Sequence, residues 1–308
     1  MTSLALLAAL VLQHYIELPR REEIVTILRR AADRLRESLD AGQVHHGALA
    51  WCAFALPAPL VLLAVERLLH PLSPLLSLAL EIGVLYLVLE FKPTVDQLNR
   101  IRHELHHGRN EEARALLAEW DVAADPGADV NELCRISIEQ ALLRFHRRLS
   151  APIFWFVLLP GTSGALLYFM AFLLWSRWGG PERATGEGFG KWPRFAFDIL
   201  DWLPLRMTAL AFAIAGNFED AVFCWRTQAR GWNDAHEGAI LASGAGALGV
   251  RLGEPLHVVG TAQYRPELGL EETADPDHLQ SAEGLLWRAT ALWAVVLLLV
   301  NLAAWFGD

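Results

Sequence analysis

Long apolar runs without charged side chains are the feature that most constrains how this chain can fold. Residues 47–65 and 149–176 contain no charged residue, and residues 72–89 contain only Glu81. A helix needs about 20 mostly apolar residues to cross a bilayer, so runs of this length predict membrane-spanning helices. The composition agrees, since 54% of the 308 residues are hydrophobic and 20% are charged. We therefore expect one membrane-embedded domain, residues 1–308, and not two soluble domains.

Six segments are expected to enter or cross the membrane, near residues 3–18, 47–65, 72–90, 150–176, 199–218 and 287–306. The fourth is interrupted at Pro160 and Gly161, so it is either one kinked span or two shorter re-entrant arms. The predicted fold is all-α, a polytopic α-helical membrane protein with about five to six transmembrane helices and helical cytoplasmic loops. Several arginines follow the first span, and positively charged residues near the end of a span are retained in the cytoplasm, so this segment is expected to be cytoplasmic. If every segment crosses once, the helical loop 92–148 and the loop 219–284 lie on the same side.

Helical periodicity also occurs outside the apolar runs. Residues 22–39 carry apolar side chains at helical spacing opposite an arginine and glutamate face. This pattern is typical of a helix on the membrane surface, or of one packed on the cytoplasmic loops. Asn131 is in position to cap a helix from Glu132 to Leu149. Residues 270–282, rich in Asp and Glu, are expected to form a loop, and no segment shows the alternation typical of a β-strand.

One short motif resembles a metal site. His103-Glu104-Leu105-His106-His107 fits the pattern H-E-x-x-H, in which two imidazoles one helical turn apart bind a metal ion and the glutamate acts as a base. Gly108 ends the helix directly afterwards, no third ligand is evident downstream, and a solvated helix end would carry the same residues. We therefore assign no metal site here. The net charge of −9 also gives no reason to expect nucleic acid as a partner.

Two groups of charged residues are stronger candidates for a functional site than this motif. Arg135 and Glu139 are four residues apart on the predicted 132–149 helix, where they form either an ordinary surface ion pair or part of a site. Asp198, Asp201 and Arg206 lie at the start of an apolar run. Because charges at that depth of a membrane are costly, these residues are either paired with one another or functional.

The segment Ala245-Gly-Ala-Leu-Gly-Val-Arg-Leu-Gly253, followed by Tyr264-Arg-Pro-Glu-Leu-Gly269, resembles the C-terminal signature of the CobD/CbiB family of cobalamin-biosynthesis membrane proteins. Stretches around residues 108–116, 135–154 and 198–206 agree with the family pattern in order and spacing. The resemblance spans nearly the whole chain. It implies a multi-pass protein of the bacterial inner membrane that joins aminopropanol phosphate to adenosylcobyric acid. The reaction is an ATP-dependent amide ligation that yields adenosylcobinamide phosphate.

The resemblance also implies roles for particular residues. The residues implied in catalysis are Glu139, Asp198 and Asp201, and those implied in binding substrate or phosphate are Arg135, Arg206, Gly246, Gly249 and Arg265. ATP and Mg²⁺ are the implied cofactors if ligase activity is retained. The implied partners are the lipid bilayer and either a corrinoid substrate or a membrane or cytoplasmic protein.

The chain departs from the family pattern at several polar positions. Leu143, Arg144 and Arg147 replace a Glu-Asn pair and an Asp, and Phe172 and Trp175 replace an Asn and an Asp. These changes remove oxygen ligands that magnesium prefers. The chain is also similar to AmpE-like inner-membrane proteins, with which it shares the stretch 200–206. The alternative function is therefore that of a non-catalytic signalling or accessory protein.

Overall fold

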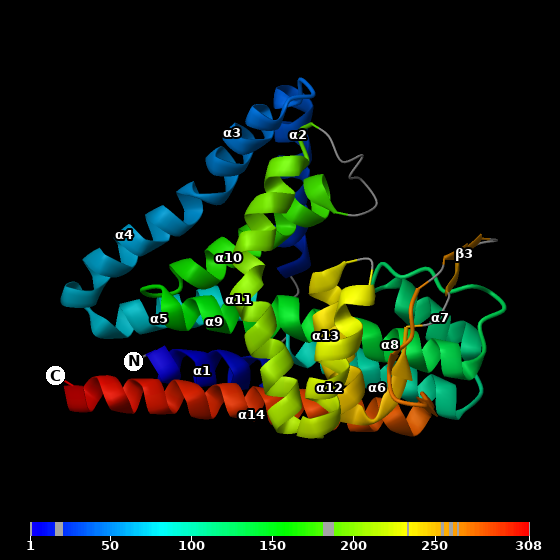
Figure 1. The fold of residues 1–308 in the computed structure, drawn as a ribbon. Helices are drawn as coiled ribbons and strands as arrows, with labels where there is room; N and C mark the ends of the chain where they lie inside the picture. Colours follow the sequence, from blue (N-terminus) through cyan, green and yellow to red (C-terminus); the bar gives the residue numbers. More distant parts are fainter. Residues whose placement is uncertain are drawn as a thin grey trace. The chain divides into compact units, whose positions relative to one another are not determined.

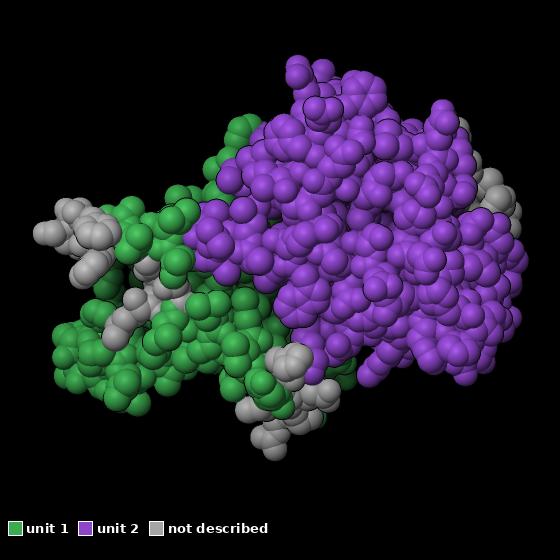
Figure 2. All heavy atoms as spheres, turned by 90° about the horizontal axis from the view of Figure 1, so that it is seen from below, with its two compact units in different colours: residues 1–90, 147–204, 297–308 green, residues 91–146, 205–296 purple. Residues whose placement is uncertain are grey.

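The computed structural model describes residues 2–15, 21–180, 188–232, 234–253, 256–258, 261–263 and 265–307. The chain forms two compact units. Unit 1 comprises residues 1–90, 147–204 and 297–308, and unit 2 comprises residues 91–146 and 205–296. Figure 2 shows unit 1 in green and unit 2 in purple. Both are built mainly of α-helices, so the prediction of an all-α fold is confirmed.

Unit 1 contains the N-terminal helices and the centre of the chain (Figure 1). Its elements are α1 (Thr2–Tyr15), α2 (Arg21–Leu39), α3 (Val44–Ala55), α4 (Pro57–Leu72), α5 (Pro74–Val88), α9 (Ala151–Leu158), α10 (Ser163–Leu174), the π-helical turn η2 (Trp175–Gly179), the first part of α11 (Lys191–Ala215) and the end of α14 (Pro276–Gly307). Within this unit α10 contacts α3, α4, α5 and α9, so α10 lies at the centre of its packing.

The predicted helix 22–39 is confirmed as α2, and the apolar hairpin also forms. Ser73 separates α4 from α5: its hydroxyl oxygen accepts a hydrogen bond from the backbone N–H of Leu76 at 3.4 Å, and Pro74 begins the next helix. Both features are typical of helix starts. The outward side chains of Leu60, Val61 and Leu68 are 60%, 62% and 66% exposed. Such a surface suits lipid.

The apolar run 149–176 is divided into two helices. The π-helical turn η1 (His146–Ser150) leads into α9, which ends at Leu158, and α10 begins at Ser163. Between them the Glu66 carboxylate accepts hydrogen bonds from the backbone N–H and the hydroxyl group of Thr162. The two helices contain 8 and 12 residues and pack against one another, and each is shorter than the roughly 20 residues of a span. Their re-entrant insertion in a membrane stays a prediction.

Unit 2 contains the remaining helices and several short strands. Its elements are α6 (Lys92–His106), α7 (Asn110–Ala118), α8 (Val130–Phe145), the second part of α11, α12 (Phe218–Gln228), the 3₁₀ turn η3 (Ala229–Gly231), α13 (Ala235–Leu248), β1 (Val250–Leu252), β2 (Leu256–Val258), β3 (Thr261–Gln263), β4 (Leu268–Gly269), β5 (Glu272–Thr273) and most of α14. The cap of α8 is Asp129, whose carboxylate accepts a hydrogen bond from the backbone N–H of Glu132 at 2.7 Å. The prediction of Asn131 as this cap was wrong.

The strands were not predicted. β1 pairs with β4 in the antiparallel sense and with β5 in the parallel sense, and β2 and β3 form an antiparallel pair. Each strand has only two or three residues, which is too short for an alternating pattern to be visible. The expected loop 270–282 is wrong in part, because β5 lies within it and α14 begins at Pro276. Proline is favoured in the first turn of a helix, where its missing N–H costs nothing.

Three helical stretches are long and apolar enough to cross a membrane. They are Val44–Leu72 with 29 residues, Pro74–His106 with 33 and Pro276–Val300 with 25. The chain is therefore a helical membrane protein. The remaining three expected segments, and the sidedness of the loops, stay predictions.

Candidate functional site

The helix α8 carries two of the predicted site residues into the interior of unit 2. Glu139 is 2% exposed and Arg135 is 5% exposed, and most of the helix around them is buried. The sequence left open that Arg135 and Glu139 form an ordinary ion pair on the helix surface. Their burial contradicts that interpretation. Arg135 Nη2 lies 3.8 Å from the Glu132 carboxylate, while Glu139 pairs with a different arginine.

The Glu139 carboxylate is held from two sides by residues of the C-terminal signature. Its Oε1 atom accepts a hydrogen bond from the backbone N–H of Gly253 at 2.9 Å. Arg265 donates from Nη1 to Oε2 at 2.8 Å and from Nη2 to Oε1 at 3.3 Å. Arg265 Nη2 also donates to the Gly253 carbonyl oxygen at 3.2 Å, and its guanidinium lies 5.1 Å from the centre of the Trp232 ring. We call these four residues, Glu139, Gly253, Arg265 and Trp232, the Glu139 cluster.

The glycines of the signature explain how Gly253 reaches Glu139. Gly246 lies where α13 passes α12 so closely that a Cβ atom would overlap the carbonyl oxygen of Asp220. Gly249 ends α13 with a φ of +78°, β1 follows, and Gly253 has a φ of +82°. Side chains other than glycine rarely adopt such angles. The structure thus assigns Gly246 and Gly249 to packing and turning, and their predicted contact with substrate stays a prediction.

A second clamp in unit 2 was missed by the sequence analysis. The Gln228 side chain donates from Nε2 to the carbonyl oxygen of Gly269 at 3.0 Å and accepts from the Gly269 N–H at 2.6 Å. It therefore fixes the end of the signature on α12. Gln228 and Trp232 belong to no recognisable motif, so only the fold identifies them.

Asp198 and Asp201 belong to unit 1, and Arg206 belongs to unit 2. Asp201 is 3% exposed and accepts a hydrogen bond from the Tyr168 hydroxyl group at 2.7 Å. Asp198 and Arg206 are half-buried. The partner of Asp201 is thus a residue of α10 outside the predicted group, and whether Asp198, Asp201 and Arg206 pair with one another or act in function stays a prediction.

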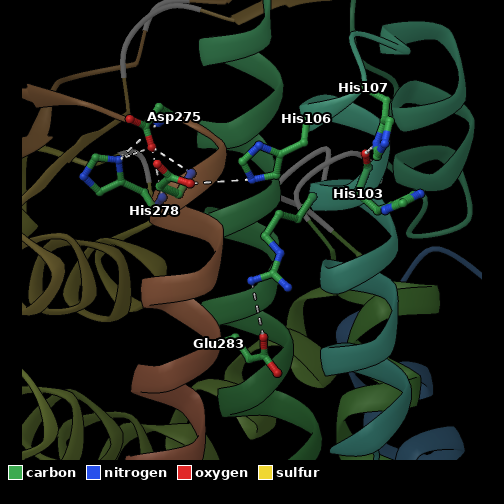
Figure 3. A network of polar contacts seen from close by, with 8 residues as sticks. His103, His106, His107, Asp275, His278 and Glu283 are labelled. Atoms are coloured by element: carbon green, nitrogen blue, oxygen red, sulfur yellow. Dashed lines mark hydrogen bonds and ion pairs between the residues drawn. The ribbon is translucent and has the colours of Figure 1, made fainter.

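The H-E-x-x-H motif forms no chelating arrangement (Figure 3). The rings of His103 and His107 lie with centres 4.3 Å apart and are tilted by 47°, and His107 Nδ1 lies 2.7 Å from the carbonyl oxygen of His103. Glu104 pairs with Arg109 at 2.6 Å, and His106 lies 3.6 Å from Asp277 of α14. Within the described ranges of the chain, no group of three or more His, Cys, Asp or Glu side chains is placed to hold a metal ion.

The Glu139 cluster does not fit a magnesium ion in this arrangement. Both carboxylate oxygens of Glu139 accept hydrogen bonds from Arg265, which carries a fixed positive charge. Magnesium needs several free oxygen ligands in an octahedral arrangement. The cluster is instead built to fix the loop at Gly253 against α8.

The chain is similar to known proteins over nearly its whole length. The family model for CobD/Cbib protein matches residues 6–286. A cobalamin biosynthesis protein CobD of Stutzerimonas stutzeri is 33% identical over 300 residues, which cover 96% of each chain. A protein of the same name from Chromobacterium violaceum is 34% identical over 253 residues, covering 81% of this chain and 78% of the relative. No solved structure gives a significant match. The chain therefore belongs to the CobD/CbiB family of cobalamin biosynthesis proteins.

Proposed function

We propose that this protein catalyses an ATP-dependent amide ligation in cobalamin biosynthesis. The amine of aminopropanol phosphate is joined to a carboxylate of adenosylcobyric acid, and the product is adenosylcobinamide phosphate. Family membership supports this reaction, as do relatives that are each named cobalamin biosynthesis protein CobD. The observation that carries the proposal is the Glu139 cluster, in which the signature residues Gly253 and Arg265 hold a carboxylate 114 and 126 residues away in the sequence.

The ligation reaction determines which groups the protein must bind. A carboxylate does not react with an amine until one of its oxygens has become a leaving group, so ATP must activate it. ATP enters with Mg²⁺ as a substrate complex, and the corrinoid is the second large substrate. The phosphate groups and the corrin carboxylates are anions, for which the guanidinium fork of arginine is well shaped. The bacterial inner membrane is the proposed location.

Within this proposal the predicted residues take different roles. Glu139 is a positioning residue, since it is buried and already bound by Arg265. Arg135 and Arg206 receive phosphate or corrin carboxylates. Asp198 is the proposed catalytic carboxylate, whereas Asp201, which is buried and accepts a hydrogen bond from Tyr168, is a positioning residue.

A genetic experiment tests the reaction. The gene is expressed in a bacterium that lacks its own cobinamide-phosphate synthase, and growth that depends on corrinoid is measured with cobyric acid as the precursor. We expect growth with the wild-type chain and none with Glu139→Ala. The Glu112→Ala variant, which removes an exposed carboxylate on α7, is the matched control and should grow. Membrane fractions are probed for each variant so that loss of insertion is recognised.

A biochemical experiment separates positioning from folding. The purified protein in detergent is given cobyric acid, aminopropanol phosphate, ATP and Mg²⁺, and cobinamide phosphate is measured by chromatography. Glu139→Gln keeps a hydrogen-bond acceptor for Gly253 but loses the ion pair, so it should lower kcat/KM while the protein stays folded. Absence of product from correctly inserted wild-type protein would refute the ligase proposal. It would favour the AmpE-like accessory role.

A further inference from the structure

One side of α11 in unit 1 is apolar and exposed. The side chains of Phe195, Ile199, Trp202 and Leu203 are between 41% and 59% exposed. Residues that follow Phe195 by four, seven and eight positions lie on the same side of a helix as Phe195 itself. We call these four residues the α11 face. Single exposed apolar side chains are common, but a contiguous group with two large aromatic rings indicates a surface that contacts lipid or another molecule.

The opposite side of α11 is packed on its neighbours in unit 1, so the α11 face points away from them. The centre of the Phe197 ring lies 5.0 Å from that of Trp175 and 5.6 Å from that of Tyr168. Trp155 of α9 donates from Nε1 to the carbonyl oxygen of Leu200 at 3.1 Å. These contacts fix the rotation of the helix about its own axis.

Two cations lie at the beginning of the same helix. Lys191 and Arg194 are exposed, and their side chains form no ion pair with a residue that the structure describes. The acidic residues in this half of α11 are less accessible, since Asp198 is half-buried and Asp201 is buried. The fully exposed charges beside the α11 face are therefore positive.

The composition and the direction of α11 suit a position along the membrane surface. Among the described residues, the three stretches that are long and apolar enough to cross a membrane do not include α11. Within unit 1, α11 runs crosswise to α1 and α5 (Figure 1), and α5 belongs to the candidate span Pro74–His106. A helix that runs crosswise to a span lies along the membrane plane. Helices in the membrane–water interface typically carry Trp, Phe and Leu on one side and basic residues beside it.

We propose that residues 191–203 lie in the membrane–water interface, with the α11 face among the acyl chains and with Lys191 and Arg194 on the phosphate groups of anionic lipids. The two basic side chains are long enough to reach the headgroups while their stems stay on apolar surface. Their charge is complementary to an anionic headgroup, which attracts basic residues near the membrane surface. The proposal replaces the predicted crossing of residues 199–203 by a position at the surface.

The depth of the α11 face is tested on the full chain in lipid vesicles. Cys52→Ser removes the exposed native cysteine, whereas Cys134 and Cys224 are buried. Ile199→Cys in this background then carries a bimane fluorophore, and the phosphatidylcholine is brominated either near the headgroup or near the middle of the bilayer. We expect the strongest quenching from the shallow bromine atoms. Glu112→Cys, at an exposed position of α7, is the control that neither lipid should quench.

Two outcomes of the depth measurement would overturn the proposal. Strongest quenching from the deep bromine atoms would indicate a helix that crosses the membrane. Quenching by neither lipid would indicate that water or a protein, such as a second copy of this chain, covers the α11 face. Accessibility of the fluorophore to aqueous iodide separates water from protein.

The preference for anionic lipid is tested with the same labelled protein. Brominated phosphatidylglycerol and brominated phosphatidylcholine are compared as quenchers at equal content. Lys191→Gln and Arg194→Gln should each lower the preference for phosphatidylglycerol by up to about fivefold, and Arg194→Lys should retain it. Arg226→Gln, an exposed cation on α12, is the matched control. No preference in the wild type, or an equal loss in Arg226→Gln, would overturn the assignment of anionic lipid. The experiment does not measure ligation, so its outcome is independent of the proposed enzyme activity.

Discussion

Removal of Arg265 should strongly destabilise the protein. In Arg265→Ala the Glu139 carboxylate stays buried, 2% exposed, and among the described residues it keeps the Gly253 N–H as its hydrogen-bond partner. Breaking a buried ion pair by removing one partner costs about 3–5 kcal/mol, since it leaves an uncompensated charge. Arg265 itself is 12% exposed, so water can relieve only a small part of this cost. The lost contact with Trp232 adds roughly 0.5–1 kcal/mol.

A double-mutant cycle separates the pair from other effects. Glu139→Ala, Arg265→Ala and the double variant are unfolded with denaturant in detergent micelles, and the free energy of unfolding is followed by tryptophan fluorescence. Residues in direct contact should show a coupling energy of about 2 kcal/mol or more. Arg226→Ala, on the exposed face of α12, is the control. The reasoning is refuted if the coupling is near zero, or if Arg265→Ala costs no more than the control.

Three further predictions follow from unit 2. Gly249→Ala should lower the free energy of unfolding by about 1 kcal/mol, because alanine is strained at a positive φ. Gly253→Ala should lower it clearly more, since its Cβ atom would also overlap the Pro266 carbonyl oxygen. Equal losses of stability in denaturant unfolding would contradict this prediction. Burial, aided by nearby carboxylates, raises the pKa of the Cys134 thiol from 9.0 to about 12. Between these values the unfolded thiol loses its proton first, so rising pH favours unfolding by about 1.4 kcal/mol per pH unit. The difference in the free energy of unfolding between wild type and Cys134→Ala should therefore change with pH by this amount. A difference that does not depend on pH in this range would refute the prediction. Gln228→Ala leaves both backbone groups of Gly269 without their side-chain partner. It should therefore lower the free energy of unfolding by about 1–3 kcal/mol and speed hydrogen exchange of the Gly269 amide. Unchanged exchange would argue against the role of Gln228 as a clamp.

Local signals in the sequence were sufficient for the helices. Apolar side chains at helical spacing opposite a charged face predicted residues 22–39 as a helix, and α2 covers Arg21–Leu39. Pro160 and Gly161 marked the break between α9 and α10. Each of these features depends on residues that are close in the chain, and that is why the sequence alone was informative.

The partners of the site residues could not be predicted in the same way. Arg135 lies on the same helical face as Glu139, four residues away, but the fold pairs Glu139 with Arg265, which is 126 residues away. Helical spacing says which side chains share a face, and it says nothing about which distant segment covers that face. The two- and three-residue strands that bring Gly253 to α8 are too short to leave a pattern.

Three of the residues that depart from the expected family pattern, Arg147, Phe172 and Trp175, contact one another in unit 1. Arg147 lies over the rings of Phe172 and Trp175, and those two rings are stacked with centres 5.8 Å apart. The aromatic faces stabilise the guanidinium of Arg147. Where the resemblance implies carboxylate and amide oxygens, this chain has a guanidinium and two aromatic rings, and these groups supply no oxygen ligand for a magnesium ion.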